Sequence, residues 1–141
     1  MSARPDLRGV DVKLYASGMI WGDGPRWHDG ALWLSDTRGS VLWTDCGGAW
    51  KAIDVPSTSH GLWFLADGRL AGAMMHEKRV AVWSGTVWET YADLAPLGVG
   101  PLGDMVGDAA GNLYVDDLAF DPAAGEAPSP GRIIQIGRAH V

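Results

Sequence analysis

Asp29-Gly30-Ala31-Leu32-Trp33-Leu34 is the stretch that decides the fold, because it is a tight turn followed by an apolar strand. The chain repeats this unit at Asp67-Gly68-Arg69-Leu70-Ala71-Gly72 and again at Ala110-Gly111-Asn112-Leu113-Tyr114-Val115. The turn glycine stands at positions 30, 68 and 111, so the intervals between copies are 38 and 43 residues. A period of roughly 40 residues built from turn-strand units predicts the four-stranded blades of a β-propeller.

Further strands can be placed around each copy. We predict a partial propeller over residues 1–135, with blade 1 over about 24–55, blade 2 over about 61–92 and an incomplete blade 3 over about 104–135. Asp-Gly is suited to the first turn of a blade because glycine adopts positive φ without steric cost. Segment 12–16 is predicted to be a lone strand before the first blade.

Helices have little support in this sequence. No stretch of about 11 residues shows apolar spacing of 3.6 without an interrupting glycine or proline. Residues 120–130, rich in Pro, Ala and Gly, are predicted to be a loop. The predicted class is therefore all-β, and a generic β-sandwich made of hairpins is the alternative.

Composition excludes several classes of protein. Hydrophobic residues make up 47% of the chain and charged residues 20%, which indicates a globular sequence. The formal net charge is −6 and no cluster of Lys and Arg exists, so nucleic-acid binding has no electrostatic footprint. Eight tryptophans predict packing between blades, with a sugar-stacking surface as the alternative.

Location can be predicted from the same data. No apolar run approaches the roughly 18 residues of a membrane helix, and residues 1–14 lack the apolar core of a signal peptide. Cys46 is the single cysteine and cannot form a disulfide framework. We therefore expect a cytoplasmic protein that binds neither membrane nor nucleic acid.

Residues 22–36, Gly-Asp-Gly-Pro-Arg-Trp-His-Asp-Gly-Ala-Leu-Trp-Leu-Ser-Asp, resemble the gluconolactonase, senescence-marker-protein and luciferin-regenerating-enzyme family. Residues 91–94 with 101–106, and residues 125–133, resemble later family segments. The resemblance covers about 19–134. It implies the N-terminal half, about three blades, of a six-bladed propeller with one divalent metal ion, Ca, Zn, Mg or Mn, in its central channel.

The same resemblance implies a function. Family members hydrolyse sugar lactones and related esters, so the enzyme class is a lactonase or carboxylic ester hydrolase. A bound cation polarises the ring carbonyl and lowers the pKa of its water. The chain is expected to be a truncated form of such an enzyme and inactive alone, because the other metal ligands of the family come from later blades. The alternatives are a non-catalytic propeller that binds a small molecule or protein, and a truncated chain that has no function.

Channel residues of a propeller come from the starts of the inner strands, and Asp23, His60 and Gly103 are topologically equivalent there. The resemblance assigns Asp23 to the metal, although family members usually have Glu, whose carboxylate reaches about 1.5 Å further. A turn Asp that bonds its own backbone is the alternative. No catalytic residue is assigned.

Substrate binding is predicted for Asp104, Gly103 and His60. The family commonly has Asn at the position of Gly103, so a substrate contact is lost there. Asp104 either accepts a substrate hydroxyl or caps the turn. His60 is a channel-facing base or ligand, or a polar residue satisfied by its neighbours.

Other polar motifs favour structural interpretations. Ser35-Asp36 and Ser57-Thr58-Ser59-His60 suggest a Ser/His/Asp hydrolase, but no nucleophile elbow is present, so strand-end hydrogen bonding is favoured. His28 is assigned to a turn. Residues 76–79, His-Glu-Lys-Arg, are predicted to be a hairpin turn, a kind of turn that can rim a propeller channel.

The last six residues, 136–141, match the translation of a common sequencing-library adapter. We therefore expect them to be a non-native tail.

Half a propeller exposes strand edges and blade faces, so the chain is expected to self-associate.

Overall fold

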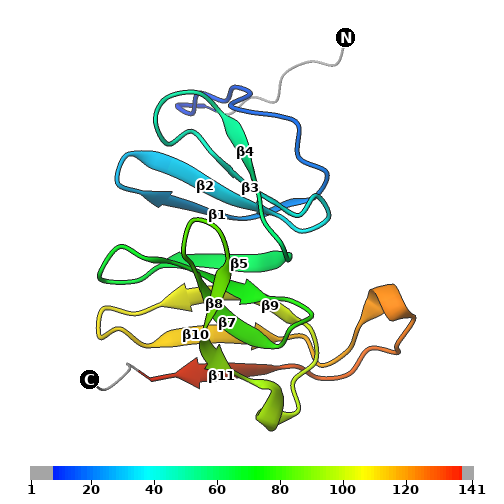
Figure 1. Ribbon diagram of the computed structural model, residues 1–141. Coiled ribbons are helices and arrows are strands. Elements are labelled where there is room, and N and C mark those ends of the chain that lie inside the picture. Colours follow the sequence, from blue (N-terminus) through cyan, green and yellow to red (C-terminus); the bar gives the residue numbers. More distant parts are fainter. Residues whose placement is uncertain (1–7, 138–141) are drawn as a thin grey trace.

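The structure is a computed structural model, and it describes residues 8–137. Within this range the chain forms three antiparallel sheets that are stacked one on the next, with blade 1 at the top of Figure 1 and blade 3 at the bottom. In the described range the only helices are two single 3-10 turns, η1 (Ala95–Leu97) and η2 (Pro122–Ala124). The all-β prediction is confirmed. Each sheet is a meander in chain order, as expected for propeller blades.

Blade 1 has the strand order β1-β2-β3-β4, formed by β1 (Gly22–His28), β2 (Ala31–Asp36), β3 (Val41–Thr44) and β4 (Lys51–Asp54). The turn between β1 and β2 places Asp29 at φ 50° and Gly30 at φ 79°. Two successive positive φ angles match the twist of a two-residue hairpin, and Asp-Gly tolerates them. The deciding motif therefore forms the turn that was predicted from it.

Blades 2 and 3 repeat this arrangement. Blade 2 consists of β5 (Ser59–Phe64), β6 (Leu70–Met74), β7 (Arg79–Trp83) and β8 (Trp88–Asp93), in that order. Blade 3 has three strands in the described range, β9 (Leu102–Gly107), β10 (Leu113–Asp117) and β11 (Arg132–Ile136). The long loop between β10 and β11 contains η2.

The core lies between the blades. Blades 1 and 2 enclose one apolar cluster, which includes Leu42, Leu62 and Met74. Blades 2 and 3 enclose the other, which includes Leu102 and Met105. Every residue of β6 is buried because blade 2 is covered on both faces, which explains why this strand is apolar throughout. Burial of each large side chain contributes roughly 1.5–3 kcal/mol.

The lone strand predicted over 12–16 is wrong. These residues have no regular structure. The segment is held by side chains instead: the Tyr15 hydroxyl donates to Asp45 and its ring packs edge-on against Trp50. The next residues cross blade 1, where Gly18 lies against the Trp43 ring.

The structure also places His28 and the start of the expected tail. His28 was assigned to a turn but is the last residue of β1, where its ring stacks on Phe64 at 3.8 Å. Of the expected tail, Ile136 pairs with Leu113 as the last residue of β11, and residues 138–141 lie outside the described range. Among residues 8–137, no helix is long and apolar enough to cross a membrane.

Candidate functional site

The three inner strands place the predicted channel positions at one end of the molecule. Asp23, His60 and Gly103 are each the second residue of their strand, β1, β5 and β9. The strands approach at backbone distance: a Cβ atom on Gly24 would lie 3.0 Å from the His60 carbonyl oxygen. Glycine at this position, with φ 64°, lets neighbouring blades meet closely.

Asp23 and His60 are brought together. His60 Nε2 is hydrogen-bonded to Asp23 Oδ2, and Asp23 Oδ1 accepts the backbone N–H of Gly24 at 2.8 Å. The His60 side chain is 18% exposed, and its Nδ1 atom is buried without a hydrogen-bond partner. A polar pair therefore links the first two blades at their inner strands, and Asp23 bonds its own backbone as a turn residue does.

This geometry does not fit a divalent cation. Both carboxylate oxygens of Asp23 are already engaged. Residues 8–137 contain no group of three or more His, Cys, Asp or Glu side chains that could hold a metal ion. Hard cations such as Ca²⁺ take six to eight oxygen ligands. The described residues thus do not assemble the ligand set of such an ion.

Asp104 is held by a residue that sequence analysis missed. Arg26 of β1 reaches past blade 2, and its Nη2 donates to Asp104 Oδ1 at 2.6 Å and to the Met105 carbonyl at 2.7 Å. The guanidinium lies 5.8 Å from the Trp63 ring centroid. Asp104 Oδ1 also accepts the N–H of Met105. Arg26 ties blade 1 to blade 3 and fixes one oxygen of this half-exposed carboxylate.

Gly103 packs against a second carboxylate that was not predicted. A Cβ atom at this position would lie 2.7 Å from Asp116 Oδ2 and 3.2 Å from Leu118 Cδ2. Asp116 of β10 therefore occupies space beside the residue that lacks a side chain. Asp116 also lines a cavity of about 640 Å³ together with Arg26, Trp63 and Asp104. A carboxylate inside a strand was the sequence signal that could have identified it.

Gly103→Ala is expected to destabilise the protein by about 1–2 kcal/mol, because the new methyl group would overlap the Asp116 carboxylate. The same substitution in an Asp116→Ala background should cost less, with a coupling of about 1 kcal/mol. Urea denaturation of the four proteins of this cycle measures the coupling. Strictly additive effects would show that Asp116 does not fill this space.

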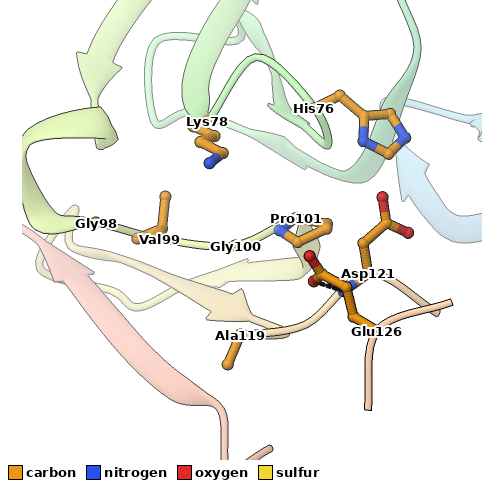
Figure 2. A pocket seen from close by; sticks show the side chains of 9 residues that line it. All are labelled: His76, Lys78, Gly98, Val99, Gly100, Pro101, Ala119, Asp121 and Glu126. Atoms are coloured by element: carbon orange, nitrogen blue, oxygen red, sulfur yellow. Dashed lines mark hydrogen bonds between the residues drawn. The ribbon is translucent and has the colours of Figure 1, made fainter. Parts of the chain in front are cut away.

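A second cavity, of about 310 Å³, opens next to the start of β9. His76 and Lys78, from the turn between β6 and β7, lie on one side of it, and Asp121 and Glu126 lie on the facing side (Figure 2). The Glu126 carboxylate accepts the backbone N–H of Asp121 at 2.7 Å, which closes the loop between β10 and β11 on itself. Pro101, one residue before β9, also lines the cavity. The predicted hairpin turn therefore borders a polar cavity close to the inner-strand positions.

In the described part of the chain, the serines that suggested a hydrolase, Ser35 and Ser59 among them, form no Ser/His/Asp triad. Ser35 Oγ lies 2.9 Å from Ser59 Oγ in a buried contact between blades 1 and 2. Asp36 accepts bonds from backbone N–H groups at the end of β2. Hydrogen bonding at strand ends, the favoured interpretation, describes both residues.

Comparison with known proteins supports the fold. No family model matches the sequence, and the search of curated proteins gave no match. Among solved structures, a luciferin-regenerating enzyme aligns with a TM-score of 0.65 and 21% sequence identity, over 84% of this chain and 43% of that one. The fold is that of a β-propeller, with three blades in this chain. The chain spans less than half of the enzyme that it matches.

Proposed function

We propose that this chain forms three blades of a six-bladed propeller that hydrolyses a sugar lactone or a related ester. Three equivalent positions, Asp23, His60 and Gly103, gather at one end of adjacent inner strands, and this is the observation that carries the proposal. The likeness of the fold to a luciferin-regenerating enzyme supports it. The substrate would enter at the end of the inner strands where the cavity of about 310 Å³, lined by His76 and Glu126, opens.

On this proposal the polar groups have separate tasks. Asp104, oriented by Arg26, accepts a hydroxyl of the substrate, and Asp116 offers a second acceptor in place of the absent side chain at Gly103. His60 holds the Asp23 carboxylate in place through their hydrogen bond, beside the central channel of the proposed propeller. A divalent cation, Ca, Zn, Mg or Mn, would need Asp23 to release His60 and would take its other oxygen ligands from blades outside this chain.

The test is activity of a longer protein from the same reading frame that contains the remaining blades. It is expected to hydrolyse glucono-δ-lactone above the background rate, and a chelator should abolish this activity. Asp23→Ala should lower kcat/KM on the order of 10-fold or more, because His60 loses the carboxylate that orients it. The 141-residue chain should match the background rate. A folded six-bladed protein without lactone turnover would contradict the proposal.

A non-catalytic propeller that binds a small molecule or a protein is the second candidate. It is favoured by the engagement of both Asp23 oxygens and by the missing side chain at Gly103. Calorimetry separates the two functions: this candidate predicts that the longer protein binds a sugar acid but does not turn over its lactone. Under both candidates we propose a cytoplasmic protein, since the exposed Cys46 is a free thiol.

A further inference from the structure

The cavity of about 310 Å³ has two walls of different charge, and both walls belong to this chain. Blade 2 supplies the basic wall, Lys78 and His76, and the loop between β10 and β11 of blade 3 supplies the acidic wall, Asp121 and Glu126. Figure 2 shows the Asp121 carboxylate pointing toward the His76 ring. Among residues 8–137, no hydrogen bond or ion pair joins the two walls. Opposite charges therefore face each other across a gap.

The acidic wall carries two carboxylates that are each held by one oxygen. Glu126 Oε1 accepts the N–H of Asp121 at 2.7 Å, and Asp121 Oδ1 accepts the N–H of Ala123 at 3.0 Å. The second oxygen of each carboxylate accepts no hydrogen bond from the described residues. Two like charges side by side repel, and a cation between them would relieve this repulsion. This wall is therefore arranged to receive a positively charged donor.

The base of the loop keeps the acidic wall away from blade 2. Asp117, which is 1% exposed, accepts the N–H groups of Gly100 and Ala119, both at 2.9 Å, and pairs with Arg132 at 2.8 Å. A Cβ atom on Gly100 would lie 2.8 Å from the Ala119 carbonyl carbon, so the two segments touch at backbone distance. The loop cannot move into the cavity without breaking these contacts.

The basic wall is fixed at its backbone as well. The N–H of Lys78 donates to the Met74 carbonyl at 3.1 Å, and the Lys78 carbonyl accepts the N–H of Leu94 at 2.9 Å. The Lys78 side chain is exposed and has no hydrogen-bond or ion-pair partner among residues 8–137. Its ammonium group is a compact charge with three donors, which suits a carboxylate. The gap between the walls is thus held open by both blades.

We propose that this cavity binds a small zwitterion, with its carboxylate on Lys78 and its ammonium group between Asp121 and Glu126. A ligand that is only anionic would leave the two carboxylates uncompensated, and one that is only cationic would leave Lys78 without a partner. The volume lies at the lower end of the range of small-molecule pockets, roughly 300–1,000 Å³, and so suits a ligand of amino-acid size. This binding goes beyond the proposed hydrolysis, because it uses none of the residues assigned to that reaction.

The probes are three ω-amino acids that differ in the separation of their charges: 4-aminobutyrate, 5-aminopentanoate and 6-aminohexanoate. Pentanoate and pentylamine are the matched ligands with one charge, and glucuronate tests a hydroxylated acid. Isothermal titration calorimetry of the 141-residue chain at pH 7 and low ionic strength measures binding. At least one ω-amino acid should bind with a Kd below about 1 mM and about 10-fold more tightly than each of the other three ligands.

Lys78→Gln should reduce the affinity for the best ω-amino acid to that for pentylamine, and Asp121→Asn with Glu126→Gln should reduce it to that for pentanoate. Lys51→Gln and Asp54→Asn are the matched controls, because both residues are exposed on β4, in blade 1. These controls should leave Kd within about twofold of the wild-type value, a difference of about 0.4 kcal/mol. Circular dichroism checks that every variant folds like the wild type.

Three results would overturn the proposal. The first is that no ω-amino acid binds more tightly than pentanoate and pentylamine. The second is that glucuronate binds more tightly than every ω-amino acid, which would assign the cavity to hydroxylated acids. The third is that binding survives in the cavity variants or is lost equally in the Lys51→Gln and Asp54→Asn controls, which would place the ligand elsewhere.

Discussion

Gly61→Ala is expected to destabilise the fold by about 3 kcal/mol, which is more than the cost expected for Gly103→Ala. A Cβ atom on Gly61 would lie 2.5 Å from the Met105 nitrogen and 2.8 Å from the Asp104 carbonyl carbon. These are backbone atoms of β9, so no rotamer change can make room. β5 and β9 would have to separate, which would loosen the core between blades 2 and 3.

Thermal and urea denaturation measure this effect, and a fall in Tm of about 10 °C is expected. Gly137→Ala is the control, because a Cβ atom there would meet no atom within 4 Å. Separation of β5 from β9 should also disturb the Arg26–Asp104 contact. A Gly61→Ala protein that unfolds at the same urea concentration as the wild type would show that the two inner strands do not touch as described.

The sequence predicted the blades well because their signals are local. An Asp-Gly turn followed by an apolar strand needs only neighbouring residues, and Gly30, Gly68 and Gly111 all adopt positive φ. Once the turns were aligned, the equivalence of Asp23, His60 and Gly103 followed. Their shared place as second residues of inner strands needed no knowledge of side-chain contacts.

Contacts between blades could not be predicted in this way. Arg26 and Asp104 are 78 residues apart, and their contact depends on how closely three inner strands approach. Asp116 beside Gly103 depends on the irregular pairing of β9 with β10 between Val115 and Asp117. The segment 12–16 was predicted to be a strand, but the structure shows no strand there, and the Tyr15 side chain holds the segment against blade 1.

Asp36→Asn is expected to lower the stability by about 2–3 kcal/mol at pH 7. The Asp36 side chain is buried and accepts the N–H groups of Ile20 and Trp21 at 2.8 and 3.0 Å, so it fixes the segment that enters β1. It also accepts N–H groups from the β2–β3 turn and the Trp43 indole. An amide keeps one acceptor oxygen but turns an NH₂ group toward these donors.

The loss should depend on pH. Burial alone would raise the pKa of Asp36, but the backbone N–H groups of Ile20 and Trp21 and the Trp43 indole outweigh burial and hold this pKa below its usual 3.8. A carboxyl group with a lowered pKa in the folded state stabilises the protein above about pH 4, and this contribution disappears as pH falls through the folded pKa. The difference in unfolding free energy between wild type and Asp36→Asn should therefore be constant from pH 7 to about 5 and shrink toward pH 2.

Urea titrations at several pH values measure this difference, and subtraction removes the effect of the other carboxylates. Asp54→Asn is the control, because this side chain is exposed on β4 of the same blade and should leave the curve unchanged. A difference that stays constant down to pH 2 would mean that the Asp36 charge is not what holds residues 20 and 21. The entry to β1, and with it the position of Asp23, would then depend on the other contacts of this segment, which include the Thr37 N–H bond to the Trp21 carbonyl and the pairing of β1 with β2.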